Sequence, residues 1–194
     1  MEAFVKHTGI IAPLDKPDID TDQIIPKQFL KRVERNGFGQ FMFYNWRYKK
    51  EGVPNPEFIL NLPSYSGCSI IATRRNFGSG SSREHAVWAL KDFGFRVIIA
   101  PSFADIFFSN CFKNGVLPII LDVTQVERLL KIQDSVELDL NSQKIAFGNE
   151  SITFEIDSHR KTRLLEGLDD IDLTLKENNN IENFENNSNI ISIF

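Results

Sequence analysis

Short apolar runs alternate with helix-like segments through the middle of the chain. Nearly every position is apolar over residues 69–73, 96–100 and 116–121, which predicts three buried strands. Helices are predicted between them over residues 83–93 and 102–113, because a glycine of the kind that ends helices follows each segment. Strand, helix, strand, helix, strand at this spacing predicts a parallel α/β unit whose sheet is covered on both faces.

The pattern becomes alternating beyond this unit. Apolar and polar residues alternate over 136–140, 143–147 and 152–156, with Asn-Ser and Gly-Asn-Glu turn sequences between them. Such alternation predicts an antiparallel meander with one face in solvent. A helix is predicted next over 158–166, closed by Gly167. The predicted fold class is therefore α/β, with a parallel unit and an antiparallel C-terminal extension.

The two ends of the chain differ from this regular middle. Residues 4–12 predict a short strand that is broken at Gly9. Residues 178–189 are rich in asparagine and are expected to be poorly ordered. We therefore divide the chain into one domain over residues 1–176 and a flexible tail over residues 177–194.

Composition narrows the classes of function. The 194 residues are 42% hydrophobic and 25% charged, which fits one globular domain. The net charge is -4 and no basic face is evident, so no nucleic-acid partner is expected. The chain has no apolar run of about 18 residues, and its first residues lack the apolar core of a signal peptide. We therefore expect a cytoplasmic protein with no membrane segment.

The cysteines and histidines do not form a metal-ligand pattern. Cys68 and Cys111 are far apart in the sequence and are expected to be two buried thiols rather than a disulfide. Two thiols cannot supply the four thiolates of a zinc or iron–sulfur site. His7, His85 and His159 are scattered along the chain. We therefore expect this chain to bind no metal itself.

The loop between the first buried strand and the first helix reads Asn-Phe-Gly-Ser-Gly-Ser-Ser-Arg-Glu-His-Ala. Gly78 and Gly80 allow a positive φ and a close approach of the backbone to a ligand. Ser81 and Glu84 have the spacing of a capping box, which predicts Ser81 at the helix N-cap. The amides of the first helical turn and Arg83 then predict a site for a small anion such as a carboxylate or phosphate.

The same residues also fit a purely structural role, in which Ser81 only caps the helix and Arg83 is solvated. Two glycines, two serines and an arginine within six positions favour the binding site. The loop lacks the lysine of a Walker motif and the third glycine of a dinucleotide fingerprint. The residues alone therefore leave the function open.

This loop resembles the signature of the swivelling domain of the aconitase superfamily. Several other motifs resemble the free-standing small subunits of the 3-isopropylmalate dehydratase family, and together the likeness covers residues 4–176. The resemblance implies an aconitase-like swivelling β/β/α domain. The motifs are Asp-Thr-Asp-Gln-Ile-Ile-Pro-Lys-Gln-Phe-Leu at 20–30, Gly-Phe-Gly at 37–39, Asn-Trp-Arg at 45–47, Ala-Pro-Ser-Phe-Ala-Asp-Ile-Phe at 100–107, Gly-Leu-Asp at 167–169 and Leu-Thr-Leu at 173–175.

The resemblance also implies an activity and a partner. Members of this family act as hydro-lyases in leucine biosynthesis, where they isomerise 2-isopropylmalate and 3-isopropylmalate through isopropylmaleate. A large subunit carries a [4Fe-4S] cluster, and the small subunit is active only in a heterodimer or higher assembly with it. This division of labour agrees with a chain that has two thiols.

The resemblance implies roles for individual residues. Ser81 matches the serine that takes and returns the proton of the substrate carbon, and Ser82 and Arg83 match residues that bind a substrate carboxylate. A serine needs its alkoxide stabilised to act as a base, and helix-start amides with Arg83 can do this. Asp22 matches an active-site aspartate of aconitases. A structural alternative for Asp22 is an Asx turn within its loop.

The part of the family that chooses the substrate falls near residues 29–33. An apolar contact for the isopropyl group is expected there, and Leu30 is our candidate. Arg32 complicates this expectation, because it would favour a more acidic substrate if it pointed inward. Two alternatives therefore stay open, namely another 2-hydroxy diacid of the citramalate/methylmalate or homocitrate type, and a non-catalytic anion-binding module.

Three further features can be explained by structural roles. His85 is expected to be structural, because a cation on the first helical turn opposes the helix dipole. Arg74 and Arg75 fit a solvated strand end as well as a site that attracts a diacid. The aromatic residues at 41–48 are expected to be core or partner surface, since no basic stripe accompanies them.

Overall fold

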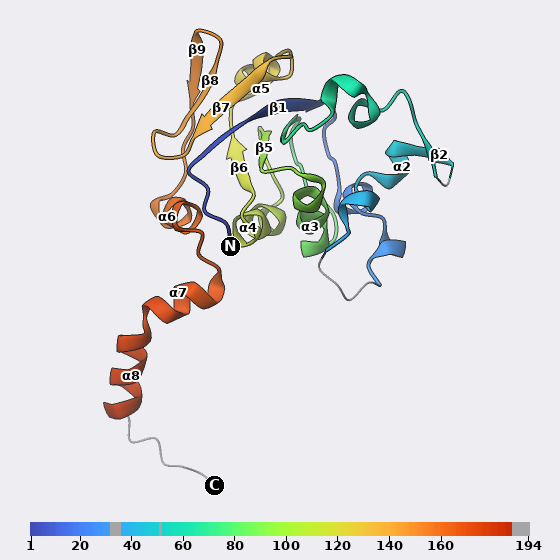
Figure 1. Ribbon diagram of the computed structural model, residues 1–194. Coiled ribbons are helices and arrows are strands. Elements are labelled where there is room, and N and C mark those ends of the chain that lie inside the picture. Colours follow the sequence, from blue (N-terminus) through green and yellow to red (C-terminus); the bar gives the residue numbers. More distant parts are fainter. Residues whose placement is uncertain (32–35, 51, 188–194) are drawn as a thin grey trace.

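The computed structural model describes residues 1–31, 36–50 and 52–187. Within these ranges, one mixed sheet contains seven strands in the spatial order β6-β5-β4-β1-β7-β8-β9 (Figure 1). The strands β6, β5, β4 and β1 are parallel, and β1, β7, β8 and β9 form an antiparallel meander. Their bounds are β1 Lys6–Leu14, β4 Ile70–Thr73, β5 Val97–Ala100, β6 Leu117–Ile120, β7 Ser135–Asp139, β8 Lys144–Phe147 and β9 Glu150–Thr153.

Strand β1 joins the two halves of the sheet. Its first part, up to Ile10, pairs antiparallel with β7, and its second part, from Ile11, pairs parallel with β4. The sequence predicted a break at Gly9, and this prediction was wrong, since the strand continues and only its partner changes. A side chain at Gly9 would place its Cβ 2.1 Å from Ser69 Oγ. Glycine therefore permits the close approach of β1 to the residue before β4.

Both faces of β4 and β5 are buried, as their continuous apolar runs predicted, whereas Ile120 of the edge strand β6 is exposed. Successive residues point to opposite faces and enter two separate cores. One core takes Ala12, Leu14, Ile71, Ile98 and Ala100, and the other takes Ile11, Ile70, Ala72, Val97 and Ile99.

Helices cover the sheet and extend the chain beyond it. Helices α3, α5 and α6 each contribute buried residues to one of these two cores. A small hairpin of β2 (Tyr48–Lys50) and β3 (Val53–Pro54) lies apart from the main sheet. The helices are α1 Thr21–Ile24, α2 Tyr44–Arg47, α3 Glu84–Phe93, α4 Asp105–Asn114, α5 Val123–Leu129, α6 Ser158–Glu166, α7 Asp170–Lys176 and α8 Asn178–Asn187, and 3-10 turns occur at Lys27–Phe29, Gly39–Phe41, Ile59–Asn61 and Pro63–Tyr65.

The predicted strands and the helices α3, α4 and α6 are all present, with ends that differ by at most three residues. The sequence analysis did not anticipate α5, although Asp122 and Gln125 form a capping box at its start. After α1, the structure forms a 3-10 turn at Lys27–Phe29 and describes the chain up to residue 31.

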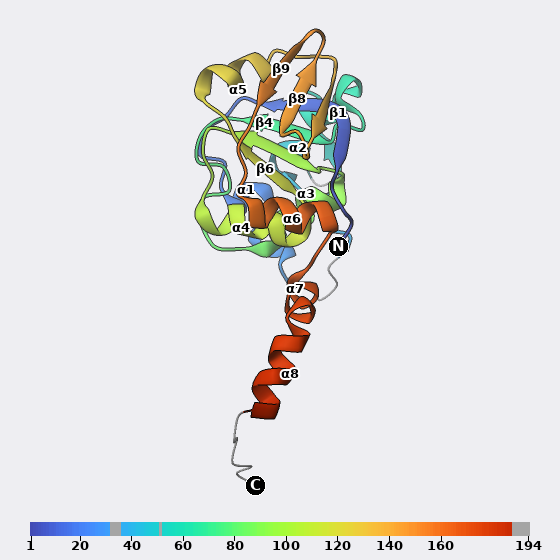
Figure 2. The same ribbon diagram turned by 90° about the vertical axis from the view of Figure 1, so that its left-hand side faces the viewer.

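The C-terminal segment is helical where no element was predicted. Helices α7 and α8 follow one another and project away from the sheet (Figures 1 and 2). Every residue of α8 is exposed. The flexibility of this tail stays a prediction. No helix in the described part of the chain is long and apolar enough to cross a bilayer.

Candidate active site

The glycine-rich loop between β4 and α3 is shaped by the side chain of Phe107. Gly78 has φ +77°, and a Cβ built there would lie 2.1 Å from Cγ of Phe107. Both the left-handed backbone and the close contact therefore require glycine at this position. Gly80 also has a positive φ, of +87°. The two glycines thus act as the sequence predicted, by relaxing the backbone.

The segment before α1 runs beside this loop and fixes its course. The amide of Gly78 donates to the carbonyl of Ile19 at 2.7 Å, and the amide of Thr21 donates to the carbonyl of Ser79 at 2.9 Å. The Thr21 hydroxyl donates to the carbonyl of Ser81 at 2.8 Å. These bonds join two segments that are some 60 residues apart in the sequence. The serine loop is therefore held in one conformation by its neighbour.

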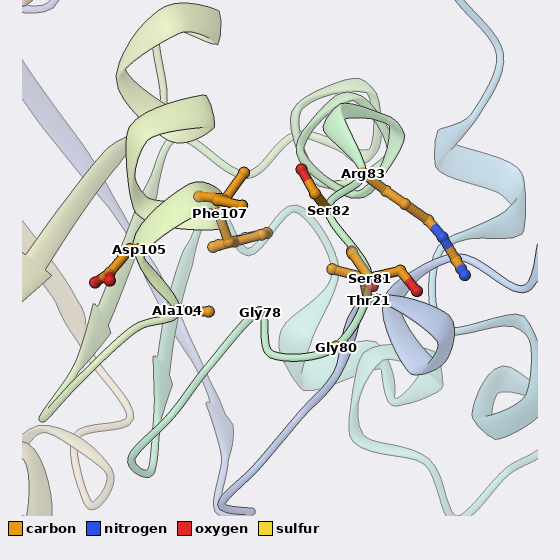
Figure 3. A pocket seen from close by; sticks show the side chains of 10 residues that line it. Thr21, Gly78, Gly80, Ser81, Ser82, Arg83, Ala104, Asp105 and Phe107 are labelled. Carbon is orange, nitrogen blue, oxygen red and sulfur yellow. The ribbon is translucent and has the colours of Figure 1, made fainter.

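A cavity of about 220 Å³ opens between this loop and the start of α4 (Figure 3). Ser81 and Ser82 are both exposed there, so a ligand or a covering protein can reach their hydroxyls. Figure 3 shows the loop on one side and the first turn of α4 on the other. The lining residues are Thr21, Gly78, Gly80, Ser81, Ser82, Arg83, Ala104, Asp105, Ile106 and Phe107.

Arg83 and Asp22 form a two-pronged ion pair at the edge of the cavity. Nη1 donates to Oδ1 at 2.5 Å and Nη2 donates to Oδ2 at 3.2 Å. The Arg83 side chain is only 10% exposed, whereas that of Asp22 is 40% exposed. Paired charge-assisted bonds of this kind fix the plane of a guanidinium. Asp22 therefore reaches Arg83 and is not itself part of the cavity lining.

The predicted capping box at Ser81 was wrong. Helix α3 begins at Glu84, and its N-cap is Arg83 in an extended conformation without a side-chain capping bond. The Glu84 carboxylate accepts instead from Nδ2 of Asn114 at 2.9 Å. A long-range partner thus replaces the local one. Ser81 lies two residues before the N-cap, still at the positive end of the α3 dipole.

Asn114, the last residue of α4, ties α4 to α3. Its Oδ1 accepts from Trp88 Nε1 at 3.0 Å, and its carbonyl accepts from Lys91 Nζ at 2.7 Å. Together with the bond to Glu84, these contacts fix the two helices whose starts flank the cavity. Local sequence patterns cannot reveal this network, because its members are up to 30 residues apart.

The second wall of the cavity was missed by the sequence analysis as a site. Ala104, Asp105, Ile106 and Phe107 belong to the motif at 100–107 but had no assigned role. One signal could have found them. The loops that follow adjacent parallel strands meet at the same edge of a sheet, and β4 and β5 are neighbours.

The structure does not bring the predicted substrate-choosing residue into the cavity. Leu30 is partly buried and packs against the core that contains Phe38 and Phe43. It is not among the residues that line the cavity. Arg32, the other candidate of this segment, lies outside the described residues.

The structure shows the contacts of His85 and Arg74, for which the sequence offered structural interpretations. The His85 ring packs against Phe38 and Trp88, with centroids 5.4 Å and 4.6 Å away. Arg74 pairs with Asp15 and Glu127 away from the cavity.

The aromatic residues at 41–48 divide between core and surface. Phe43 is fully buried and stacks on Trp46 at 5.1 Å between ring centroids. Tyr44 and Tyr48 are half-buried, with centroids 4.8 Å apart. This segment is therefore part of the folded body rather than a separate platform.

The residues of this chain do not fit an iron–sulfur cluster. Cys68 and Cys111 are buried as unpaired thiols, as predicted. Burial raises the pKa of the Cys68 thiol to about 11 and also raises the pKa of Cys111, so both disfavour the thiolate that would bind iron. Among the described residues, no group of three or more His, Cys, Asp or Glu side chains is arranged to bind a metal ion.

Comparisons with known proteins show which family resembles this chain. A family model described as the aconitase C-terminal domain matches residues 1–124. A 3-isopropylmalate dehydratase small subunit from Brevibacillus brevis is 54% identical, over 95% of this chain and 98% of the relative. The corresponding protein from Anoxybacillus flavithermus is 57% identical, over 90% of this chain and 92% of the relative.

A solved structure gives the same result. The crystal structure of 3-isopropylmalate dehydratase (leuD) from Methanocaldococcus jannaschii superimposes with a TM-score of 0.68 and 28% identity, over 93% of this chain and 99% of that chain. The aconitase-like α/β fold expected from the sequence is thereby confirmed. The chain belongs to the small-subunit family of 3-isopropylmalate dehydratase, a hydro-lyase of the aconitase family.

Proposed function

We propose that this chain supplies the serine loop of a 3-isopropylmalate dehydratase in leucine biosynthesis, and that it works only when a large subunit covers its cavity. The family membership supports the overall activity. The observation that carries the assignment of the site is the exposure of Ser81 and Ser82 at an open cavity beside the fixed guanidinium of Arg83.

In this proposal Ser81 moves the proton. In dehydration a C–H bond of the substrate breaks, its electron pair forms the C=C bond, and hydroxide leaves from the neighbouring carbon. The Ser81 oxygen accepts the proton, and proton and hydroxide together make the water that is lost. Rehydration with the hydroxyl on the other carbon gives the isomer. The positive end of the α3 dipole and the nearby Arg83 lower the free energy of the Ser81 alkoxide.

Ser82 and Arg83 bind a substrate carboxylate, while Asp22 positions Arg83. Two of the five guanidinium N–H donors face Asp22, so the rest of the fork is available to a ligand. The carboxylate of Asp22 thus acts on the substrate through Arg83. Asp22 is a positioning residue in this proposal rather than the catalytic group that the sequence predicted.

The iron–sulfur cluster belongs to the large subunit in this proposal, since the donor set of this chain does not suit it. Two unpaired buried thiols also suit a reducing, cytoplasmic location. The substrate is a 2-hydroxy diacid that carries an alkyl group, and the apolar wall of Ala104, Ile106 and Phe107 is compatible with that group.

The test is reconstitution with a cluster-loaded large subunit, followed by hydration of isopropylmaleate. The chain alone should show no turnover, and the mixture should consume isopropylmaleate. Ser81→Ala should lower kcat by about 10³-fold or more, because the proton carrier is lost. The matched control is Ser79→Ala, in the same loop but outside the cavity lining, which should retain activity.

Two results would contradict the proposal. A fully active Ser81→Ala enzyme would remove the proton-transfer role of this serine. Failure of the wild-type mixture to turn over any 2-hydroxy diacid, although the subunits form a complex, would remove the activity itself. Native gel filtration of each variant with the large subunit separates a loss of chemistry from a loss of assembly.

A further inference from the structure

The end of the chain carries two helices that leave the body of the protein. We define residues 169–187, which contain α7 and α8, as the C-terminal arm. Both views show the arm extending away from the sheet and its covering helices (Figures 1 and 2). Its root is fixed, because Asp170 pairs with the largely buried Arg163 of α6 at 2.7 Å. Lys176 pairs with Glu166 of the same helix.

The arm exposes large apolar side chains. Ile171 and Leu175 are four positions apart on α7, and Ile181 and Phe184 are three apart on α8, so each pair shares a helix face. Ile171 is 71% exposed and Phe184 is 69% exposed. Four of the nine exposed large hydrophobic residues in the described chain lie in this short segment. Such a concentration marks a surface that binds something.

Within the described residues, helix α8 buries none of its side chains. All ten residues are exposed, and six of them are asparagine, a poor helix former. Isolated helices of fewer than about 12 residues are marginal in water. The bonds within it, such as Asn178 Nδ2 to Glu182 at 2.6 Å, are solvent-exposed. The helix therefore needs a surface outside this chain to be stable.

Charge selects the kind of surface. The arm carries six carboxylates and one lysine, so two copies of it would repel each other. An apolar groove with a basic rim fits it instead. Part of the arm has a counterpart in a relative, because the match to the Brevibacillus brevis small subunit covers 95% of this chain. About ten residues of this chain lie outside that match, which is fewer than the 19 residues of the arm.

We propose that the C-terminal arm docks on the large subunit, with Ile181 and Phe184 of α8 seated in an apolar groove that has a basic rim. This inference rests on the proposed function, since that function supplies the partner. It goes beyond it by placing part of the binding energy in a segment away from the cavity. The acidic side chains of the arm guide the approach, and the apolar pair determines how long the complex persists.

The test measures the Kd of the full chain for the purified large subunit by isothermal titration. The double variant Ile181→Ser/Phe184→Ser should weaken binding at least tenfold. The matched controls are Asn183→Ser in the same helix and Val123→Ser, an exposed apolar residue of α5, and both should bind like wild type. With enough large subunit to saturate binding, kcat of the double variant should equal that of wild type, because none of its changes touches the cavity.

A second experiment tests the role of the acidic side chains. Glu182→Gln/Glu185→Gln should slow association at low salt and flatten its dependence on salt concentration. Circular dichroism should show a gain of helix when wild type binds, and less gain for the double apolar variant.

The outcomes separate the two proposals. If wild type does not bind the large subunit, the proposed function fails. If wild type binds and the Ile181→Ser/Phe184→Ser variant binds equally well, the docking role of the arm is overturned while the proposed function stands. Self-association of wild type that the double variant abolishes, seen by sedimentation without the large subunit, would assign the arm to a second copy and also overturn the inference.

Discussion

The serine loop and the C-terminal arm are two polar segments with opposite kinds of support. The serine loop is held in place within the chain. Phe107 packs against Gly78, and hydrogen bonds join the loop to Ile19 and Thr21. The arm is joined to the body by ion pairs between α7 and α6, and it exposes most of its large apolar side chains. The difference shows that this chain holds the serine loop in place by itself, whereas α8 buries none of its own side chains.

The largest effect is expected from a substitution that disturbs the packing beneath the serine loop. Gly78→Ala should lower the free energy of unfolding by about 3 kcal/mol or more, because its Cβ would meet Cγ of Phe107 at 2.1 Å in a left-handed backbone. Urea denaturation measures this loss. Gly67→Ala is the matched control, since Gly67 has φ +73° with nothing within 4 Å of a built Cβ.

Gly67→Ala should cost only about 1 kcal/mol, which is the backbone term alone. Equal losses in the two alanine variants would mean that the contact with Phe107 does not shape the loop.

An effect of intermediate size is expected when the ion pair between Asp22 and Arg83 at the cavity edge is removed. Asp22→Asn removes the charge that orients Arg83, and hydrogen bonds to charged groups contribute about 1.5–3 kcal/mol. We expect kcat/KM to fall roughly 10- to 100-fold, chiefly through a higher KM, because in the proposed function Arg83 binds substrate in both ground and transition states. Steady-state kinetics with the wild-type large subunit gives both constants.

Asp15→Asn is the control for this variant, since Asp15 pairs with Arg74 away from the cavity and should leave both constants unchanged. A drop in kcat with an unaltered KM would instead assign Asp22 a direct part in the chemistry.

The smallest effect is expected in the arm. Phe184→Ala should change the free energy of unfolding of the isolated chain by less than about 0.5 kcal/mol, because the ring buries little surface within the chain. Phe112→Ala is the contrasting variant, at a ring that is 3% exposed, and should cost about 3–5 kcal/mol. Urea denaturation of the two alanine variants compares the regions directly, and a large loss from Phe184→Ala would show that the arm packs on its own chain.

Sequence patterns predicted those features that depend on neighbours along the chain. The three parallel strands follow from continuous apolar runs, and α3 ends where Gly94 adopts φ +121°. The meander follows from alternation, although its attachment to β1 does not, since strand pairing is set by distant residues. These are local rules that tertiary packing obeys here.

Predictions failed where a distant group competes with a near one. Glu84 has the spacing to cap with Ser81, but Asn114 from α4 takes its carboxylate. Asp22 and Arg83 are 61 positions apart, so their pairing was invisible before the fold was known. Leu30 packs partly buried against the core, and its contact with substrate, which the resemblance implies, stays a prediction.

The double pairing of β1 has a consequence for how the molecule opens. Residues up to Ile10 form backbone hydrogen bonds with the meander, and residues from Ile11 form them with the parallel strands that lead into the serine loop. One continuous backbone thus couples both halves, so neither can melt without loosening the other. Amide protons on either side of Gly9 should exchange with deuterium in a single cooperative event rather than in two stages.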